Sequence, residues 1–154
     1  MEIRRYLTGE EETLRHLFYE TVHRINIQDY TQAQVDAWAP AEYDHEAWIE
    51  RLKGTSPWVA VEGDELLGFA EMDSAGRIDC FYVHHARQGR QVGGALIQKL
   101  QREALRLGLS HLEVEASISA RGFFQRKGFT TVRRQQVERR GEILINYLME
   151  KSIG

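Results

Sequence analysis

The apolar positions of the first fifty residues repeat mainly at helical spacing. They predict one short strand followed by three helices, over residues 3–6, 8–23, 31–38 and 44–52. Thr8 is placed to cap the first of these helices, with Glu11 three residues further on, and Pro40 ends the second. The N-terminal third is therefore expected to be largely helical.

From residue 58 the apolar positions follow the shorter period of strands. Apolar runs separated by turns predict strands over residues 58–61, 66–70, 78–83, 112–116, 130–139 and 143–150. Two helices are predicted among them, over residues 92–107 and 120–127, and each is followed by a glycine. The order of elements predicts one α/β (α+β) domain over residues 1–154, with a mixed, mostly antiparallel sheet flanked by helices.

Composition narrows the class of protein. The chain has 154 residues, 42% of them hydrophobic and only two of them proline, which is enough to build one globular core. Its 20 basic and 23 acidic residues argue against a surface built for nucleic acid. A single cysteine excludes an internal disulfide, and no apolar run is long enough for a membrane span or signal peptide. We therefore expect a cytoplasmic protein without nucleic-acid or membrane partners.

The most informative segment joins the strand over residues 78–83 to the helix over 92–107. Gly89, Gly93 and Gly94 let the backbone approach a ligand closely, and the amides of a first helical turn favour an anion. Residues 77–106 contain six basic and two acidic side chains. This pattern predicts a phosphate or pyrophosphate site, and a strand-to-helix turn with solvated arginines remains the alternative.

Two common phosphate motifs do not match this loop. Gly89 and Gly94 have the spacing of a P-loop, but Ala95 and Leu96 stand where Lys and Ser or Thr should follow. The G-x-G-x-x-G dinucleotide motif cannot be laid on the three glycines. A nucleotide-binding protein is therefore the least favoured explanation of the loop.

The loop does resemble the acyl-CoA loop of the GNAT N-acetyltransferases, [QR]-x-x-G-x-[GA]. The matching run is Gln88-Gly89-Arg90-Gln91-Val92-Gly93, with Gln91 in place of the fourth-position glycine. A second family element, N-x-x-A-x-x-x-Y-x-x-x-G-F, resembles the run from Ser117 to Phe129. The order of elements is similar across nearly all of the chain. A Tyr-x₇-Trp-Ala-Pro stretch beginning at Tyr30 resembles a branch of small bacterial GNAT proteins of uncertain substrate.

The resemblance implies a GNAT fold and a direct transfer of acetyl from acetyl-CoA, a co-substrate, to a primary amine. It implies that loop amides hold the pyrophosphate, and that pantetheine lies along residues 81–83 in a splay between this strand and residues 112–116. A backbone N–H near Tyr82 or Val83 would polarise the acetyl carbonyl. The implied cofactor-binding residues are Phe81, Tyr82, Val83, Gln88, Gly89, Arg90, Gln91, Val92, Gly93, Gly94, Ala95, Ser117, Phe124 and Lys127.

Three departures from the family pattern bear on activity. Gln91 replaces a glycine, Ser117 replaces an asparagine, and Phe124 replaces the tyrosine that often protonates the leaving thiolate. Tyr147 and Tyr82 are candidates for a substitute acid, and each could equally be a packing tyrosine. These departures leave open a second function, a catalytically weak or inactive acyl-CoA-binding regulatory module of the same fold.

Asp79 is the candidate general base, because it is the only carboxylate within the predicted central strand and a buried carboxylate is costly without a role. It could instead pair with Arg77 or Arg133, and water could relay the proton. Cys80 lies in mid-strand and is expected to pack rather than react. The six histidines share no ligand spacing, so no metal is implied.

The acceptor side is predicted from the N-terminal helices. Residues 1–56 contain eleven acidic and six basic side chains, a field that favours a small cationic amine, with a peptide or protein amine as the other option. Tyr30 and Trp38 are the candidate acceptor-binding residues. The apolar final strand over residues 143–150 could pair across a homodimer or fill the core.

Overall fold

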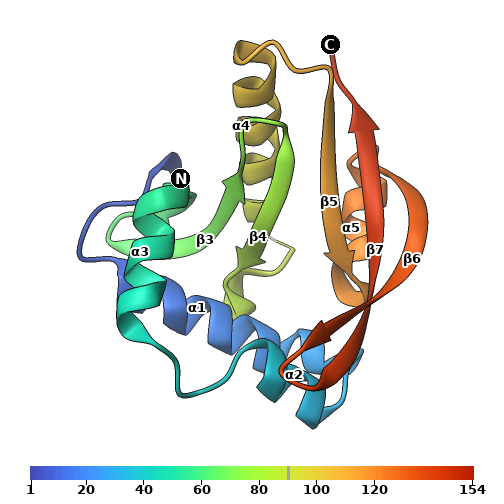
Figure 1. The fold of residues 1–154 in the computed structure, drawn as a ribbon. Coiled ribbons are helices and arrows are strands. Elements are labelled where there is room, and N and C mark those ends of the chain that lie inside the picture. The colour runs from blue at the N-terminus through green and yellow to red at the C-terminus, as the bar shows by residue number, and fades with distance from the viewer. Residues whose placement is uncertain (90) are drawn as a thin grey trace.

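A computed structural model describes residues 1–89 and 91–154 of the chain (Figure 1). Its centre is a seven-stranded sheet with the strand order β1-β2-β3-β4-β5-β7-β6. The strands are β1 (Glu2–Arg5), β2 (Trp58–Glu62), β3 (Glu65–Met72), β4 (Arg77–Val83), β5 (His111–Ser117), β6 (Thr130–Arg139) and β7 (Glu142–Ser152). Every pair is antiparallel except β4 with β5, so the predicted mixed, mostly antiparallel sheet is confirmed.

The parallel pair β4–β5 is also where the sheet opens. The two strands are in register only at Arg77 with Glu113 and at Ile78 with Val114. Beyond these positions β4 turns away with β3, and β5 stays with β7, which it pairs along its whole length. The divergence is plain in Figure 1, where β4 and β5 separate toward the lower half of the molecule. The sheet thus has two leaves joined at one end.

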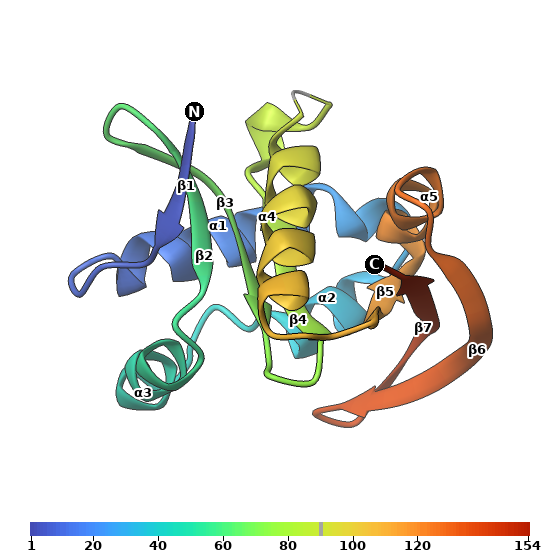
Figure 2. The same cartoon turned by 90° about the horizontal axis from the view of Figure 1, so that it is seen from above.

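Helices cover both faces of the sheet. The helices are α1 (Glu11–Arg24), α2 (Gln32–Trp38), α3 (His45–Thr55), α4 (Val92–Arg106) and α5 (Ile118–Arg126), with short 3-10 helices η1 (Asn26–Gln28) and η2 (His85–Arg87). Figure 1 shows α1 below β3 and β4 and α4 behind them, and the core contacts place the two helices on opposite faces of β3. Figure 2 shows α4 beside the sheet in the view from above. Because both faces are covered, β3 is buried at six consecutive positions.

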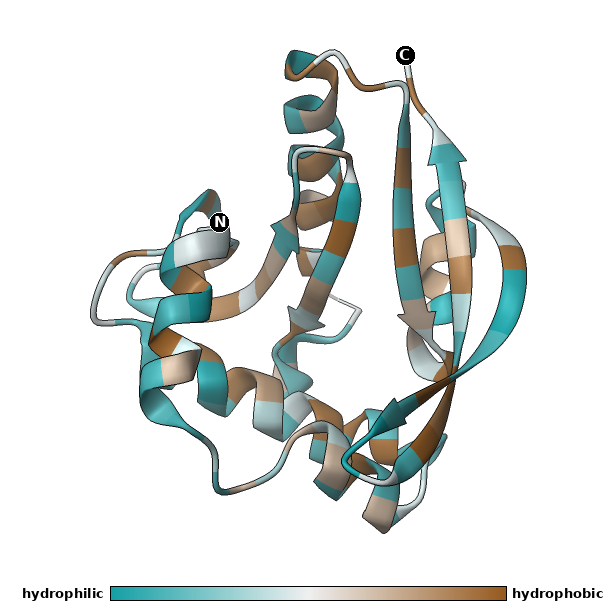
Figure 3. Ribbon diagram, viewed as in Figure 1, coloured by the Kyte–Doolittle hydropathy of each residue, from teal (hydrophilic) through white to brown (hydrophobic). Residues whose placement is uncertain are grey.

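Two hydrophobic clusters form the core, one on each face. Leu66 and Phe69 of β3 pack with α1, whereas Leu67 and Ala70 pack with α4. Strand β5 has the alternation typical of a strand with one buried face, visible as bands along it in Figure 3. Among the described residues, no helix combines the length and the apolarity that crossing a bilayer would require.

The predicted start of the first helix is wrong by three residues. Thr8 does not cap it, because α1 begins at Glu11 and its N-cap position is Glu10, which makes no side-chain capping bond. Glu10 instead accepts hydrogen bonds from Arg4 and from the backbone N–H of Leu7, which closes the turn between β1 and α1. An ion pair between residues six apart therefore takes the place of the predicted cap.

Candidate active site

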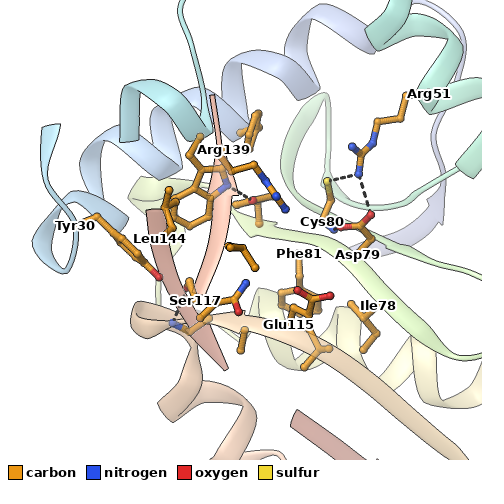
Figure 4. Close-up of a pocket in the computed structure, with 18 of the residues that line it drawn as sticks. Tyr30, Arg51, Ile78, Asp79, Cys80, Phe81, Glu115, Ser117, Arg139 and Leu144 are labelled. Atoms are coloured by element: carbon orange, nitrogen blue, oxygen red, sulfur yellow. Dashed lines mark hydrogen bonds and ion pairs between the residues drawn. The ribbon is translucent and has the colours of Figure 1, made fainter. Parts of the chain in front are cut away.

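The opening between β4 and β5 forms a cavity of about 690 Å³. This volume lies in the usual range of small-molecule sites. Its walls come from the two diverging strands, from α1–α3, and from the turn between β6 and β7. Figure 4 shows Arg139 and Leu144 on one side of it and Arg51, Cys80 and Asp79 on the other, with Glu115 and Ser117 of β5 below.

The loop after β4 is held by contacts to its own strand and to β3. Gln88 donates from Nε2 to the carbonyl of Val83 at 2.8 Å. The His84 ring accepts from the Ala86 amide at 3.0 Å, and Arg87 forms an ion pair of 2.6 Å with Glu65. These bonds fix where the chain leaves β4. Arg90, the remaining predicted loop residue, lies outside the described residues.

The first turn of α4 packs against α5, which explains the glycine at position 93. A Cβ on Gly93 would lie 2.9 Å from the Phe123 ring, and one on Gly94 would lie 3.2 Å from Nζ of Lys127. Lys127 therefore holds its ammonium group beside the turn whose free amides favour an anion. This end of the splay therefore has a positive charge beside the first turn of α4.

Gln91 precedes α4 in a left-handed conformation, with φ of 64° and ψ of 10°. The family motif has glycine here, and glycine adopts this conformation without the strain of a Cβ. The left-handed conformation costs the Gln91 side chain about 1 kcal/mol. Val92 and Ala95 follow within the first helical turn, Val92 buried and Ala95 partly exposed.

The open edge of β4 presents backbone groups to the splay. The carbonyl of Val83 points away from β3, because it accepts bonds from Gln88 and from Thr21 Oγ at 3.0 Å. The next residue, His84, donates its amide toward β3. Since N–H and C=O of one strand residue face the same edge, the Val83 N–H faces the opening as well.

Aromatic side chains line the wall formed by α1, α2 and β4. Trp38 donates from Nε1 to the hydroxyl of Tyr82 at 3.0 Å. Burial raises the pKa of the Tyr82 phenol well above its ordinary value, so this hydroxyl keeps its proton. Tyr30 donates to the Ile145 carbonyl and accepts from the Ile118 amide, so its hydroxyl joins β7 to α5. The two predicted acceptor residues, Tyr30 and Trp38, thus both line the cavity.

The other predicted residues near α5 are placed differently. Ser117 caps α5 by accepting from the Ala120 amide at 3.0 Å, which accounts for the short polar residue at this position. Phe124 is 1% exposed and packs edge-on against Phe81, so it forms an apolar wall of the splay. Tyr147 is not brought into the cavity, because its ring lies 4.2 Å from the guanidinium of Arg121 on the α5 face.

The expectation that Asp79 is buried is wrong, since its side chain is 75% exposed at the cavity wall. Its partner is neither Arg77 nor Arg133 but Arg51 of α3, at 3.2 Å. A β-bulge causes this. Ala70 pairs with Phe81 and Glu71 with Asp79, so Cys80 is the extra residue and the neighbouring side chains are re-aimed.

The buried carboxylate of this region is Glu71, which the sequence analysis missed. It is 2% exposed and accepts from Arg51 at 2.7 Å and from the Thr55 hydroxyl at 2.5 Å. The hydrogen bond to Glu71 is the main cause that raises the pKa of the Arg51 guanidinium. The signal for this pair was an acidic residue at the end of a strand that otherwise reads as apolar.

Glu71, Asp79 and Cys80 hold potential metal-ligand atoms within 4.8 Å of one another. Nη2 of Arg51 lies 2.7, 3.2 and 3.1 Å from these three side chains, so a guanidinium already occupies the position of a cation. Burial, with the charge of Glu71 added to it, raises the pKa of the Cys80 thiol. A neutral thiol in this position is a poor nucleophile, which agrees with its predicted packing role.

Comparison with known proteins identifies the family. The family model of the acetyltransferase (GNAT) domain matches residues 26–151. The chain belongs to the GNAT acetyltransferase family. The predicted resemblance and the predicted enzyme class, an N-acetyltransferase, are thereby confirmed. The uncharacterized N-acetyltransferase YafP of Escherichia coli K12 is 34% identical to this GNAT chain over 149 residues, 97% of this chain and 94% of YafP.

Solved structures agree with the GNAT fold. A GCN5-related N-acetyltransferase from Rhodopseudomonas palustris superposes with a TM-score of 0.94 at 33% identity, over 99% of this chain and 95% of that one. The PaiA N-acetyltransferase from Thermoplasma acidophilum, in complex with coenzyme A, has a TM-score of 0.76 at 17% identity, over 99% and 98% of the two chains. YncA from Salmonella typhimurium, with its cofactor acetyl-CoA, has a TM-score of 0.69 at 20% identity, over 100% and 94%.

Proposed function

We propose that this GNAT protein transfers an acetyl group directly from acetyl-CoA to a primary amine of a small molecule, a peptide or a protein. The observation that carries the proposal is the splay between β4 and β5, which opens into a cavity of about 690 Å³, with the ammonium of Lys127 beside the first turn of α4. Two structural neighbours, PaiA and YncA, hold coenzyme A and acetyl-CoA. We take residues 1–154 as one catalytic domain.

The residues present suit a CoA molecule in this splay. The pyrophosphate would be held by amides of the loop from residue 88 to 94, with the ammonium of Lys127 beside Gly94. Pantetheine would extend along β4 past Phe81 and Val83, against the apolar wall of Phe124. Gln91 adopts a left-handed conformation, which glycine, the family residue at this position, adopts without strain.

Bound acetyl-CoA would supply an acetyl thioester at the acceptor end of the splay. The Val83 N–H faces this opening and is the donor best oriented to hold the carbonyl oxygen, where negative charge develops during transfer. A backbone donor held by a strand is already oriented, so little reorganisation is needed at the moment of reaction.

Tyr82 is the favoured proton donor of the two predicted tyrosines. Its hydroxyl accepts from Trp38 and keeps its own proton free to donate, whereas Tyr147 packs beneath Arg121 outside the cavity. For the amine, the exposed carboxylate of Asp79 at the cavity wall is the favoured base. A water relay remains the alternative route for that proton.

The first experiment is thermal unfolding of the protein with and without saturating acetyl-CoA, with ATP as the control ligand. At ~100 times its dissociation constant a ligand adds about 2.7 kcal/mol of stability, which raises Tm by several degrees. We expect a shift with acetyl-CoA and none with ATP. Equal shifts would support a nucleotide-binding protein, and no shift with acetyl-CoA would contradict the proposal.

The second candidate function is an acyl-CoA-binding module without turnover. The substitutions at Gln91 and Phe124 favour it, because one affects the loop and the other removes the usual phenol. Release of free CoA thiol from acetyl-CoA in the presence of primary amines distinguishes the two functions. An acetyl-CoA thermal shift without amine-dependent thiol release would favour the module.

A further inference from the structure

The cavity is richer in arginine than in carboxylate. Its described lining includes five arginines and three acidic residues. Two of the arginines are neutralised, Arg51 by Glu71 and Asp79, and Arg77 by Glu115. The other three, Arg15, Arg139 and Arg140, form no ion pair with a carboxylate among the residues that the structure describes.

Arg15 is the exceptional member of this set, because it is buried. The residue is only 9% exposed, on the inner face of α1. Its Nη2 donates to the carbonyl of Pro40 at 2.7 Å, but its buried Nε has no hydrogen-bond partner among the described residues. A buried arginine without a carboxylate is costly, and an unmet donor adds to that cost.

The rings around Arg15 do not replace an anion. Its guanidinium lies 4.2 Å from the Tyr43 ring, 5.0 Å from that of Phe18 and 5.5 Å from that of Trp48. Such contacts contribute attraction of about 0.5–2 kcal/mol each but accept no in-plane hydrogen bond from Nε. All three rings line the same cavity, so the cation is held at the wall where a ligand would lie.

A second positive charge lies close to this one. Burial, aided by the neighbouring charge of Arg140, lowers the pKa of the Arg15 guanidinium. Arg140 is fixed by a bond from Nη1 to the carbonyl of Ala37. It stands at the β6–β7 turn, next to Arg139, which Figure 4 shows at the cavity wall. Two neighbouring cations facing a cavity both gain from an anion placed between them.

We propose that the acceptor is a small amine that carries a carboxylate, and that Arg15, assisted by Arg140, binds this carboxylate. The inference rests on the proposed acetyl transfer and names the substrate class of that site. The Phe18 ring contacts both Arg15 and Tyr82. Its centre lies 5.0 Å from the Arg15 guanidinium and 4.8 Å from the centre of the Tyr82 ring. A carboxylate at Arg15 therefore leaves an amine a few bonds away near the reacting end of β4.

This inference differs from the cationic acceptor expected from sequence. Of the eleven acidic residues in the first 56, only Asp44 lines the cavity. Oδ1 of Asp44 accepts from the Ala47 amide at the start of α3, so it serves as a helix cap. The negative field of the N-terminal helices is therefore not directed at the acceptor.

The test compares 3-phenylpropionate with 3-phenylpropionamide, which differ in charge but hardly in shape. Isothermal titration of the full chain without acetyl-CoA measures both dissociation constants. We expect the carboxylate to bind at least about tenfold more tightly than the amide. Arg15→Gln should bring that ratio close to one, whereas Arg134→Gln, an exposed arginine of β6 outside the cavity, should leave it unchanged.

Since Arg15 is buried, its variant is checked by circular dichroism. If it does not fold, Arg140→Gln on the exposed β6–β7 turn decides, and it should lower the ratio several-fold. Equal binding of the two probes, or displacement of the carboxylate by equimolar inorganic phosphate, would overturn the inference.

Acetyl transfer separates this inference from the proposed function. With phenylalanine and phenylalaninamide as acceptors, we expect a higher kcat/KM for the amino acid, and Arg15→Gln should remove the preference. Equal kcat/KM values would refute the carboxylate acceptor while leaving acetyl transfer intact. Carboxylate binding without transfer to any amine would instead contradict the proposed function.

Discussion

The contact between the first turn of α4 and α5 can be tested with two neighbouring glycines. A Cβ added to Gly93 would meet the Phe123 ring at 2.9 and 3.0 Å, closer than packed carbon atoms lie. A Cβ added to Gly94 would meet only Nζ of Lys127 at 3.2 Å, the far end of a flexible side chain. Neither glycine has a positive φ, so backbone strain does not enter the comparison.

The expected free energies follow from these contacts. Replacing glycine by alanine in a helix stabilises the folded state by up to about 1 kcal/mol, and both positions share this gain. Overpacking against a partly buried ring that packs on the core, as Phe123 does, costs roughly 1–3 kcal/mol. Gly94→Ala should therefore be neutral or stabilising, and Gly93→Ala should be less stable than Gly94→Ala by about 1–3 kcal/mol.

Thermal or urea unfolding of the unliganded variants measures this difference. For a chain of this size, 1–3 kcal/mol corresponds to a difference in Tm of roughly 3–12 °C. In a Phe123→Leu background the penalty at Gly93 should shrink, because residues in contact couple. Equal stabilities of the two alanine variants, or an unchanged penalty in the Phe123→Leu background, would show that Phe123 does not limit the space at Gly93.

Three further predictions concern the site. Tyr82→Phe should lower kcat for acetyl transfer by ~10²-fold or more, because a positioned proton donor is lost. Tyr147→Phe should change kcat little. Steady-state kinetics of both variants checks this, and equal kcat values for the two would contradict it. Gln91→Gly should relieve a left-handed side chain and leave stability unchanged or raise it by up to about 1 kcal/mol, measured by urea unfolding. Arg51→Met should lower the free energy of unfolding by about 2–3 kcal/mol, because it leaves the Glu71 carboxylate buried without its cation. The loss is smaller than for a fully buried pair because Arg51 is 41% exposed. Adding Glu71→Leu to the Arg51→Met variant should recover part of the lost stability, and no recovery would argue against this cause.

Local sequence patterns were sufficient to predict the helices and strands and to identify the family. The apolar positions repeat at helical spacing over residues 92–107 and at strand spacing over residues 130–150. This spacing reflects which face of a single element is buried, so residues close in sequence are enough to predict the element. The loop from residue 88 to 93 is contiguous, so its resemblance to the acyl-CoA loop is readable without a fold. At the position of its departure, Gln91 adopts a left-handed conformation, which a glycine would adopt without strain.

Side-chain direction near the cavity was not readable in this way. The alternation of side chains along a strand predicts the face of the strand on which Asp79 lies. The bulge at Cys80 changes the residues that the Asp79 side chain contacts. Asp79 therefore lies exposed, and Glu71, which the sequence analysis passed over, is buried with Arg51. A bulge depends on the register of two strands, which no single segment encodes.

The amino-acid sequence by itself determined the order of helices and strands and the GNAT membership. Only the tertiary structure decided that Tyr82 rather than Tyr147 faces the cavity, and that Arg15 is buried there without a carboxylate. The physical reason is the range of the interactions. Periodicity and turns depend on residues close in sequence, whereas the charge and depth of the cavity depend on α1, β4 and the β6–β7 turn meeting in space.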